Sequence, residues 1–316
     1  MRIVIQIPCF NEERSLPDVL KDIPREILGA DEVLVQVIND GSTDDTAEVA
    51  AAYQVDFILN NIGNKGLAYS FHRGMMHALN INADILVNTD GDNQYPSRYI
   101  EDLVRPIINK QADIVVGNRQ TQTISHFSRT KKFFQWLGTR ATITLSGDDM
   151  LEDAVSGFRA YSREALCELN ITSSFSYILD TTIQASNKKL KTLSIPIHTN
   201  APTRKSRLFS NMWEHMYKSG KQLLRVFAMY KPLRVFFGLG SIFFLIGAIP
   251  IIRFLYAYFF GFDSDGKIQS LVIGCMFISI SMNMMALGIL GDLLSKNRQL
   301  IEANLRQTKE RMGIKM

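Results

Sequence analysis

The sequence contains few cysteines, and none of them is placed as cysteine chemistry requires. Only Cys9, Cys167 and Cys275 occur in 316 residues, without the paired spacing of a metal motif or a redox centre. The five histidines also lack the spacing of a zinc site. These absences exclude a disulfide scaffold and a structural zinc domain, and we expect the folded part to lie in the reducing environment of the cytosol.

Common nucleotide-binding fingerprints and a secretion signal are missing as well. The chain has neither the Gly-x-Gly-x-x-Gly pattern of dinucleotide-binding proteins nor the Walker sequence Gly-Lys-Ser/Thr. Residues 1–8 read as a strand that leads into polar sequence, without the longer apolar region and small-residue cleavage site of a signal peptide. We therefore expect neither a dinucleotide site nor a P-loop, and no export of the folded part.

Positive charge is concentrated in the second half of the chain. Residues 203–234 contain eight basic residues and one acidic residue, and residues 292–316 contain six basic and three acidic residues. The intervening residues 235–291 sum to zero, so the overall net charge of +4 leaves −6 for residues 1–202. An acidic globular part joined to basic segments beside apolar runs favours a membrane protein over a nucleic-acid-binding protein.

Short apolar runs alternate with helix-forming stretches over residues 1–202. This alternation predicts βαβ units and a mostly parallel sheet with flanking helices, an α/β, Rossmann-like fold. Open sheets of this type bind ligands outside the carboxyl ends of their strands, so we expect the loops at residues 8–13, 39–44, 64–66 and 90–94 to share one crevice. The predicted strands are residues 2–7, 32–38, 56–59, 83–87, 113–117 and 193–197.

Two carboxylates follow the predicted strand at residues 83–87. Asp90 and Asp92 are separated only by Gly91. Carboxylates this close, past the end of a buried strand, can converge on Mg²⁺ or Mn²⁺, which prefer oxygen ligands and often bridge carboxylates to phosphates. The alternative is an ordinary surface turn, because Asp, Gly and Asn are common in turns. These residues alone leave both interpretations open.

Six short motifs occur in an order that resembles one family. They are Ile-Pro-Cys-Phe-Asn-Glu-Glu, Ile-Asn-Asp-Gly-Ser-Thr-Asp-Asp-Thr, Asn-Lys-Gly, Asp-Gly-Asp-Asn-Gln-Tyr-Pro, Val-Gly-Asn-Arg and Ser-Gly-Phe-Arg-Ala. Together they resemble family-2 glycosyltransferases with the GT-A fold, and more narrowly the polyprenyl-phosphate glycosyltransferases related to dolichyl-phosphate mannose and glucose synthases. The resemblance covers residues 1–202. It implies a nucleotide-sugar donor, a divalent metal and two C-terminal membrane helices.

The resemblance places the metal in the loop that contains the two carboxylates. Asp92 is implied as the direct ligand of Mg²⁺ or Mn²⁺, with Asp90 and Gln94 as further oxygen ligands. A metal there would act as Lewis acid and template while charge builds on the leaving diphosphate. The implied catalytic residues are Asp92, Arg119 and Asp153.

Other strand-end loops are implied to bind the nucleotide sugar. Pro8, Phe10 and Glu12 match the first nucleotide-contact loop, and Asp40 matches a base- or ribose-binding aspartate. Asp40 would otherwise be an N-cap of the next helix, and Phe10 would otherwise fill the core. Lys65 lies at a predicted helix start that suits an anion, or it is a solvated surface lysine.

Arginines and an acidic residue complete the implied site. Arg119, at a strand end, and Arg129, in a basic helix predicted at residues 129–145, are candidates for gripping phosphates, although Arg129 could equally lie on lipid headgroups. Asp153 is interpreted as orienting groups rather than removing a proton, because a phosphate with a second pKa of about 6 is largely deprotonated at neutral pH. Arg159, with Ser156, holds the acceptor phosphate or pairs with Asp153.

Two long uncharged runs predict a transmembrane hairpin. Residues 235–252 are uncharged and the apolar stretch continues past Arg253 to about residue 260, and residues 268–291 form the second run. At about 1.5 Å per residue, each can cross a bilayer core of roughly 30 Å. The alternative is a buried hairpin of a soluble protein. The basic flanks and the short, slightly acidic connection place both termini on the cytosolic side.

The predicted organisation has six parts. A cytosolic GT-A domain is followed by a basic amphipathic helix on the inner leaflet, a first transmembrane helix, a short non-cytosolic loop, a second transmembrane helix and a basic cytosolic tail. The membrane would be the plasma membrane of a prokaryote or the endoplasmic reticulum of a eukaryote, and the tail is available for assembly into a homo-oligomer. In order, the parts are residues 1–202, 203–232, 233–260, 261–267, 268–291 and 292–316.

The residues and the resemblance together predict an inverting hexosyltransferase. It would transfer one hexose from a UDP- or GDP-sugar to undecaprenyl or dolichyl phosphate at the cytosolic face, with no nucleic-acid partner. Two alternatives stay open: a glycosyltransferase with another lipid or a polysaccharide acceptor, and a non-catalytic membrane scaffold that binds nucleotide. A processive polysaccharide synthase is disfavoured, because no Gln-x-x-Arg-Trp element occurs.

Overall fold

The computed structural model describes residues 1–120, 153, 156–171, 177–200, 220–221, 225, 228–260 and 268–312. The chain divides into two compact units, one formed by Met1–Leu223 with Asn304–Met316 and the other by Leu224–Ala303. The helix expected at residues 129–145, most of the amphipathic helix expected at residues 203–232 and the loop expected at residues 261–267 lie outside the described residues.

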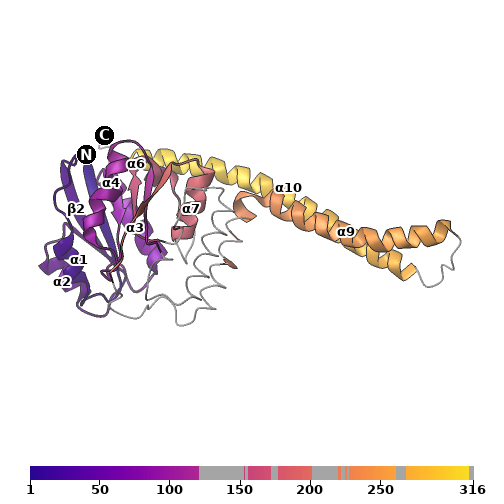
Figure 1. The fold of residues 1–316 in the computed structure, drawn as a ribbon, viewed down its shortest axis with the longest axis horizontal. Coiled ribbons are helices and arrows are strands. Elements are labelled where there is room, and N and C mark those ends of the chain that lie inside the picture. The colour runs from indigo at the N-terminus through magenta and orange to yellow at the C-terminus, as the bar shows by residue number, and fades with distance from the viewer. Residues whose placement is uncertain are drawn as a thin grey trace. The chain divides into compact units, whose positions relative to one another are not determined.

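The first unit is built on a seven-stranded sheet (Figure 1). Among the described strands every neighbouring pair is parallel except the two that involve β6, which runs antiparallel to β4 and to β5. The mostly parallel GT-A-like sheet expected from the sequence is confirmed, and one reversed strand is added to it. In spatial order the strands are β3 (Phe57–Asn60), β2 (Glu32–Asn39), β1 (Arg2–Cys9), β4 (Ile85–Asn88), β6 (Arg159–Ser162), β5 (Ile114–Asn118) and β7 (Thr192–Pro196).

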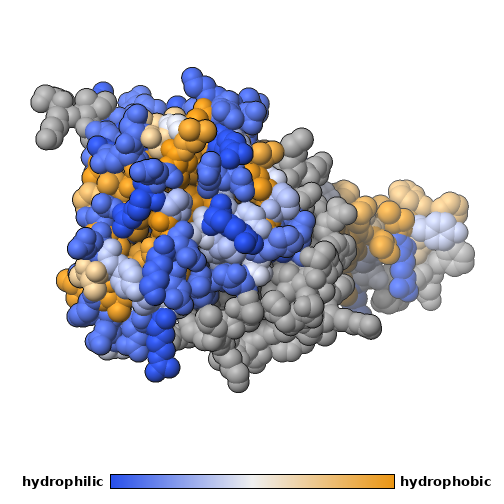
Figure 2. All heavy atoms as spheres, turned by 60° about the vertical axis from the view of Figure 1, so that its left-hand side comes forward, coloured by the Kyte–Doolittle hydropathy of each residue, from blue (hydrophilic) through white to orange (hydrophobic). Residues whose placement is uncertain are grey.

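Helices cover both faces of the sheet, and each face has its own apolar core (Figure 1). Ile3, Ile5 and Ile7 of β1 belong to one core and Val4 to the other, because successive side chains of a strand point to opposite faces. Figure 2 shows hydrophilic residues over much of the presented surface of this unit, with apolar residues between them. The first core is covered by α1 (Leu16–Asp22), α2 (Thr46–Ala52) and, after the short helix η1 (Ser97–Tyr99), α4 (Ile100–Ile108); the second is covered by α3 (Leu67–Asn80), α6 (Arg163–Glu168) and α7 (Tyr177–Asn187).

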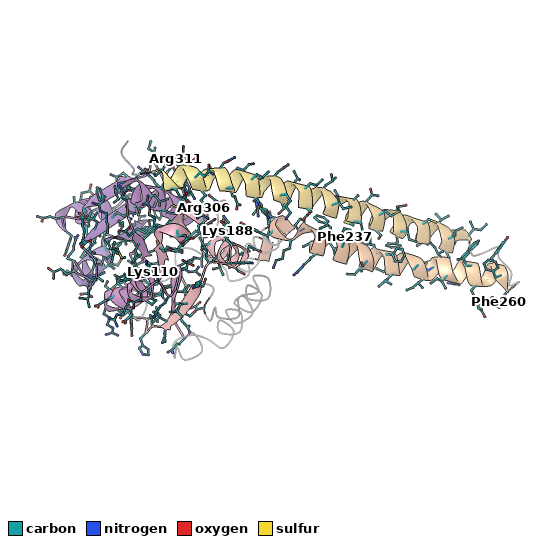
Figure 3. The ribbon with its side chains drawn as sticks, turned by 90° about the horizontal axis from the view of Figure 1, so that it is seen from above. Lys110, Lys188, Phe237, Phe260, Arg306 and Arg311 are labelled. Carbon is teal, nitrogen blue, oxygen red and sulfur yellow. The ribbon has the colours of Figure 1, made fainter. Side chains whose placement is uncertain are left out.

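Two helices, α9 (Pro232–Phe259) and α10 (Ile268–Glu310), are long and apolar enough to cross a membrane. Many of their apolar side chains are exposed, and Ile249 is 69% exposed, which would be unfavourable in water. Phe237, labelled in Figure 3, lies instead against Gly288 of the facing helix. Within the second unit the helices approach closely, since a Cβ on Gly247 would lie 2.8 Å from the Gly274 carbonyl oxygen. The expected apolar helices are therefore present, and the helix expected at residues 268–291 and the tail helix expected at residues 292–316 form one continuous helix that ends at Glu310.

The last turns of α10 belong to the first unit. Arg306 forms an ion pair with Glu168, the last residue of α6, and Lys188 approaches the same carboxylate (Figure 3). Lys309 is almost fully buried, and its ammonium donates to Asn170 Oδ1 and to the preceding carbonyl group. Positive charge is favourable at the carbonyl end of a helix. The described part of the tail therefore packs within its own chain.

We expect Lys309→Met to destabilise the first unit. Two hydrogen bonds from a charged group contribute about 3–6 kcal/mol together, so the melting temperature should fall by roughly 6–24 °C. The measurement is thermal unfolding of the detergent-solubilised chain. Arg311→Met removes an exposed cation from the same tail (Figure 3) and should change little. Equal melting temperatures for the two variants would contradict a structural role for the buried ammonium.

Candidate active site

Loops from four neighbouring strands meet at the carboxyl edge of the sheet. The Asp40 amide donates to the Cys9 carbonyl, and the Asn61 amide donates to the Asn39 carbonyl, both at 2.8 Å. These bonds join the loops that follow β1, β2 and β3. A Cβ on Gly91 would lie 2.8 Å from Cys9 Sγ, so the loop after β4 packs against the loop after β1. The structure thus brings together the loops that the sequence predicted to share one edge.

Asp90, Asp92 and Gln94 lie in the loop after β4. Asp92 Oδ1 accepts a hydrogen bond from the Gln94 amide at 3.1 Å, and Asn93 between them has a left-handed φ of 56°. Burial, followed by the neighbouring Asp92 carboxylate, raises the pKa of Asp90 to about 7, although Arg119 opposes the shift. Two ionised carboxylates this close repel each other, and a bound cation would stabilise their charged forms.

The donor set of this loop fits Mg²⁺ or Mn²⁺. Asp90 and Asp92 offer carboxylates and Gln94 offers an amide oxygen, which are the ligands that hard divalent cations prefer. Among the described residues no cluster of three or more His, Cys, Asp or Glu side chains could hold a metal. Mg²⁺ is usually bound by one or two carboxylates plus substrate phosphates rather than by an all-protein cage. The loop is suited to a cation shared with a diphosphate.

Asp40 organises the loop after β3. Its carboxylate accepts hydrogen bonds from the Lys65 and Gly66 amides at 2.9 and 2.8 Å, and from Asn61 Nδ2 at 2.8 Å. The N-cap residue of α2 is Asp45, so the interpretation of Asp40 as a helix cap is wrong. Lys65 has an exposed side chain and lies two residues ahead of the first residue of α3. The loop is therefore held in shape before any ligand binds.

Pro8, Phe10 and Glu12 lie at and beyond the end of β1. Pro8 is buried, whereas Phe10 is partly exposed and belongs to neither apolar core of the described residues. The Glu12 amide donates to Thr46 Oγ1 at 2.8 Å, and its carboxylate accepts from Ser15 Oγ at 2.7 Å. Glu12 therefore fixes the loop, and Phe10 presents part of its ring at the edge where the loops meet.

Arg119 and Asp153 form a two-bonded ion pair. Arg119 Nε and Nη2 donate to the two carboxylate oxygens at 2.8 and 2.9 Å, and the side chains are 10% and 5% exposed. Burial lowers the pKa of Arg119 and Asp153 raises it, with a net upward shift, so the guanidinium stays charged. This charge also lowers the pKa of Asp90 and thus acts on the acidic loop. Arg129 lies outside the described residues.

Arg159 and Ser156 lie inside the domain rather than at its surface. Arg159 is 1% exposed, and its Nε donates to the Ser156 carbonyl at 2.8 Å while Nη1 donates to Thr182 Oγ1 at 2.9 Å. The Ser156 side chain is fully buried. Burial on this scale keeps both side chains from an acceptor phosphate, which corrects their predicted role. Arg159 instead ties the turn ahead of β6 to α7.

Two side chains that the sequence analysis did not single out lie behind Asp90. Asn88 Nδ2 donates to the Gly157 carbonyl at 3.0 Å and to Tyr177 Oη at 2.9 Å. A Cβ on Gly157 would lie 3.6 Å from both carboxylate oxygens of Asp90. The sequence offers one signal for Asn88: it is a polar residue at the end of a strand that is buried on both faces, where apolar residues are usual.

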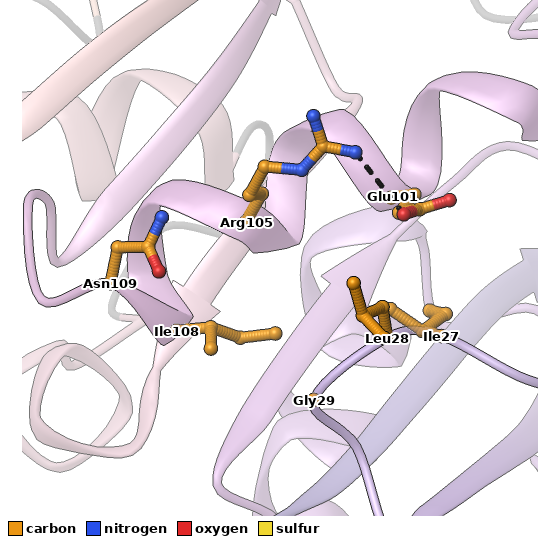
Figure 4. Close-up of a pocket in the computed structure, with 7 residues that line it drawn as sticks. All are labelled: Ile27, Leu28, Gly29, Glu101, Arg105, Ile108 and Asn109. Atoms are coloured by element: carbon orange, nitrogen blue, oxygen red, sulfur yellow. Dashed lines mark hydrogen bonds and ion pairs between the residues drawn. The ribbon is translucent and has the colours of Figure 1, made fainter.

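A hollow of about 340 Å³ lies apart from these loops, between α4 and the segment that precedes β2 (Figure 4). Its lining residues come before β2 and before β5 in the chain, so they lie toward the amino ends of strands whose carboxyl ends carry the candidate site. The hollow therefore does not belong to that site. It is lined by Ile27, Leu28, Gly29, Glu101, Arg105, Ile108 and Asn109.

Residues 4–169 match the family described as Glycosyl transferase family 2. A UDP-N-acetylglucosamine–dolichyl-phosphate N-acetylglucosaminyltransferase of Methanococcus voltae is 27% identical over 218 residues, 62% of this chain and 85% of that protein. An undecaprenyl-phosphate 4-deoxy-4-formamido-L-arabinose transferase of Photorhabdus laumondii is 26% identical over 308 residues, 93% of this chain and 89% of that protein. Eight such relatives are matched over 52 to 93% of their own length.

The fold is similar to that of a solved glycosyltransferase. Glucosyl-3-phosphoglycerate synthase from Mycobacterium tuberculosis, in complex with Mn²⁺, UDP-glucose and phosphoglyceric acid, matches with a TM-score of 0.54 and 19% identity, over 72% of this chain and 78% of that chain. At this identity the likeness shows the fold alone. The family match, in contrast, spans more than half of the sequence and includes every loop of the acidic edge. The chain therefore belongs to glycosyl transferase family 2, and it is an enzyme of the hexosyltransferase class.

Proposed function

We propose that this enzyme transfers one hexose, with inversion, from a nucleotide sugar to a polyprenyl phosphate. The observation that carries the proposal is the presence in one chain of the acidic loop with Asp90 and Asp92 and of two helices apolar enough to enter a membrane. The Photorhabdus relative, whose name specifies undecaprenyl phosphate, matches across both parts. The proposed donor is a UDP- or GDP-sugar, and the proposed acceptor is undecaprenyl or dolichyl phosphate.

The acidic loop is the donor side of the proposed site. Asp92, Asp90 and Gln94 would hold Mg²⁺ or Mn²⁺, which when bound supplies Lewis-acid stabilisation for the leaving nucleoside diphosphate. The loop organised by Asp40 supports binding of the base or ribose, and the partly exposed Phe10 would stack on the base. The proposed nucleotide-sugar contacts are Pro8, Phe10, Glu12, Asp40, Lys65 and Asp90.

The proposed reaction needs no strong base. An acceptor phosphate oxygen forms the bond to the anomeric carbon while the bond from that carbon to the diphosphate oxygen breaks on the opposite face, which inverts the centre. The acceptor has a second pKa of about 6, so it is largely deprotonated at neutral pH. Asp153 therefore orients Arg119 through their two hydrogen bonds, and the charge of Arg119 favours departure of the diphosphate.

The proposed reaction takes place at the cytosolic surface of a membrane. The basic segment at residues 203–232 would lie on the inner leaflet, beside the catalytic domain at residues 1–202. Basic flanks around the two apolar helices support cytosolic termini, with residues 261–267 across the membrane. The phosphate of the polyprenyl lipid, at the level of the lipid headgroups, would then reach the nucleotide sugar bound from the cytosol.

We expect Asp92→Ala to abolish transfer while folding and membrane insertion persist. Removal of one group that stabilises developing charge lowers turnover by about 10²–10³-fold. The measurement is radiolabelled sugar recovered in organic-extractable lipid, with UDP- and GDP-sugars tested against a polyprenyl phosphate. Asp22→Ala, at an exposed carboxylate of α1, is the control. Full activity of the Asp92 variant, or of the wild type after chelation of divalent metal, would contradict the proposed metal role.

We expect Arg119→Lys to lower kcat roughly 10- to 100-fold, less than the loss of about 10²–10³-fold that follows complete removal of a group that stabilises developing charge. Lysine keeps the charge but cannot form the planar two-bonded contact with Asp153. Steady-state kinetics should show a smaller change in the KM for the nucleotide sugar. Arg105→Lys alters an exposed pair with Glu101 and serves as control. An equal loss in both variants would mean that the buried pair has no special role.

A further inference from the structure

Three amide side chains lie side by side across the middle of the sheet. In the strand register, Gln6 of β1 is opposite Gln36 of β2 on one side and Asn88 of β4 on the other. All three side chains are fully buried. Strands buried on both faces usually carry apolar residues, and a buried amide left without partners would cost about 1–3 kcal/mol. We call these three residues the amide row.

The amide row is hydrogen-bonded in a single direction. Gln36 Nε2 donates to Gln6 Oε1 at 3.2 Å, and Gln6 Nε2 donates to Asn88 Oδ1 at 2.9 Å. Asn88 Nδ2 then donates to the Gly157 carbonyl at 3.0 Å and to Tyr177 Oη at 2.9 Å. The last donors of the row are therefore directed at the turn ahead of β6 and at α7.

The outer end of the row is also satisfied, and α3 is adapted to it. His77 Nδ1 lies 2.7 Å from Gln36 Oε1, and Gln36 Nε2 also donates to the Gly74 carbonyl at 2.9 Å. A Cβ on Gly74 would overlap Gln6 Oε1 and lie 2.9 Å from Ile38 Cδ1. Glycine inside a helix costs about 1 kcal/mol relative to alanine. The chain thus gives up helix stability to accommodate the row, which a set of aliphatic side chains would not require.

The inner end of the row lies against the candidate metal loop. Tyr177 Oη donates to the Gly157 carbonyl at 3.2 Å, and the Tyr177 ring stacks on Phe71 with centroids 3.9 Å apart. A Cβ on Gly157 would lie 3.2 Å from Tyr177 Oη and 3.6 Å from both Asp90 carboxylate oxygens. The Gly157 carbonyl therefore accepts hydrogen bonds from two side chains, and a methyl group added to Gly157 would be in ordinary van der Waals contact with the Asp90 carboxylate. Asn88 itself is two residues ahead of Asp90.

We propose that Asn88 and Tyr177 are positioning residues, which act through the Gly157 peptide to hold the Asp90 carboxylate in place relative to residues 156–158. The inference rests on the proposed function, because Asp90 is there a ligand of the divalent metal. Neither residue touches the substrates. Both determine where the acidic loop stands beside the Arg119–Asp153 pair, and a small displacement of a reactive group can lower a rate about 100-fold.

Tyr177→Phe tests the inference, since it removes the hydroxyl and keeps the ring that stacks on Phe71. We expect Mn²⁺ to tighten UDP or GDP binding to the wild-type chain, and we expect this metal-dependent gain to fall about tenfold or more in the variant. Binding measured with EDTA should not change. The measurement is isothermal titration calorimetry of the purified full-length chain with each nucleotide, with and without Mn²⁺. Gly157→Ala, which crowds Tyr177 Oη and so disturbs its hydrogen bond to the Gly157 carbonyl, should give the same loss.

Tyr161→Phe is the matched control. Tyr161 is fully buried in the same apolar core and also contacts Phe71, so the control removes one buried hydroxyl from the same environment. We expect Tyr161→Phe to bind UDP or GDP more tightly with Mn²⁺, as the wild-type chain does, and to melt at a temperature similar to that of the wild type. An unchanged gain in both Tyr177→Phe and Gly157→Ala would overturn the inference, as would an equal loss in the control.

The same titrations separate this inference from the proposed function. A wild-type chain that binds nucleotide with Mn²⁺ dependence but transfers no sugar to a polyprenyl phosphate would overturn the proposed acceptor and leave the positioning role standing. A wild-type chain that binds neither UDP nor GDP more tightly with Mn²⁺ would overturn the positioning role, because Asp90 would then hold no metal.

Discussion

The partial burial of two neighbouring carboxylates at the end of β4 is the constraint on which the rest of the site depends. Asp90 and Asp92 are two residues apart, and burial, followed by the charge of Asp92, raises the pKa of Asp90 to about 7. Arg119 supplies a nearby positive charge, but Asp153 already shares it through two hydrogen bonds. A further cation would offset the negative charge of the acidic loop. Such an arrangement reduces the stability of the empty protein and favours the state with metal and diphosphate bound.

The closely packed sheet holds the two carboxylates close together despite their unfavourable charge interaction. β1 is buried along almost its whole length and lies between β2 and β4, with an apolar core on each face. Close packing of this kind allows little relaxation, so the ends of the strands are fixed points from which the loops start. Within that apolar surrounding, the amide row is a directional polar element that ends behind Asp90. Because buried hydrogen bonds have few alternative partners, they fix one geometry where apolar contacts alone would permit several.

The parts of the fold that the sequence predicted are those that short patterns encode. Strands and helices up to β5 follow from apolar runs that alternate with amphipathic stretches, and the acidic loop is recognisable from three adjacent residues. A loop and strand are predicted at residues 152–161, but the antiparallel direction of β6 and the helix α7 are not, because both depend on distant partners. Asn88 is in register with Arg159, and it forms a hydrogen bond with Tyr177 at a separation of 89 residues. For the same reason sequence reasoning placed Arg159 at a phosphate. Its charge suggested a ligand site, but tertiary packing buried it against Thr182.

The charges of the described site bear on the class of acceptor. Asp153 accepts both hydrogen bonds from the Arg119 fork, so taking up a proton would disrupt that pair. Asp90 has a pKa of about 7, but it is assigned to the metal. His72 and His77 lie in α3, outside the strand-end loops, and burial lowers the pKa of both. A hydroxyl acceptor would require a general base within hydrogen-bond reach, whereas a phosphate arrives with its negative charge already in place. The engagement of Asp153 with Arg119 therefore fits the proposed phosphate acceptor, which needs no general base from the described residues.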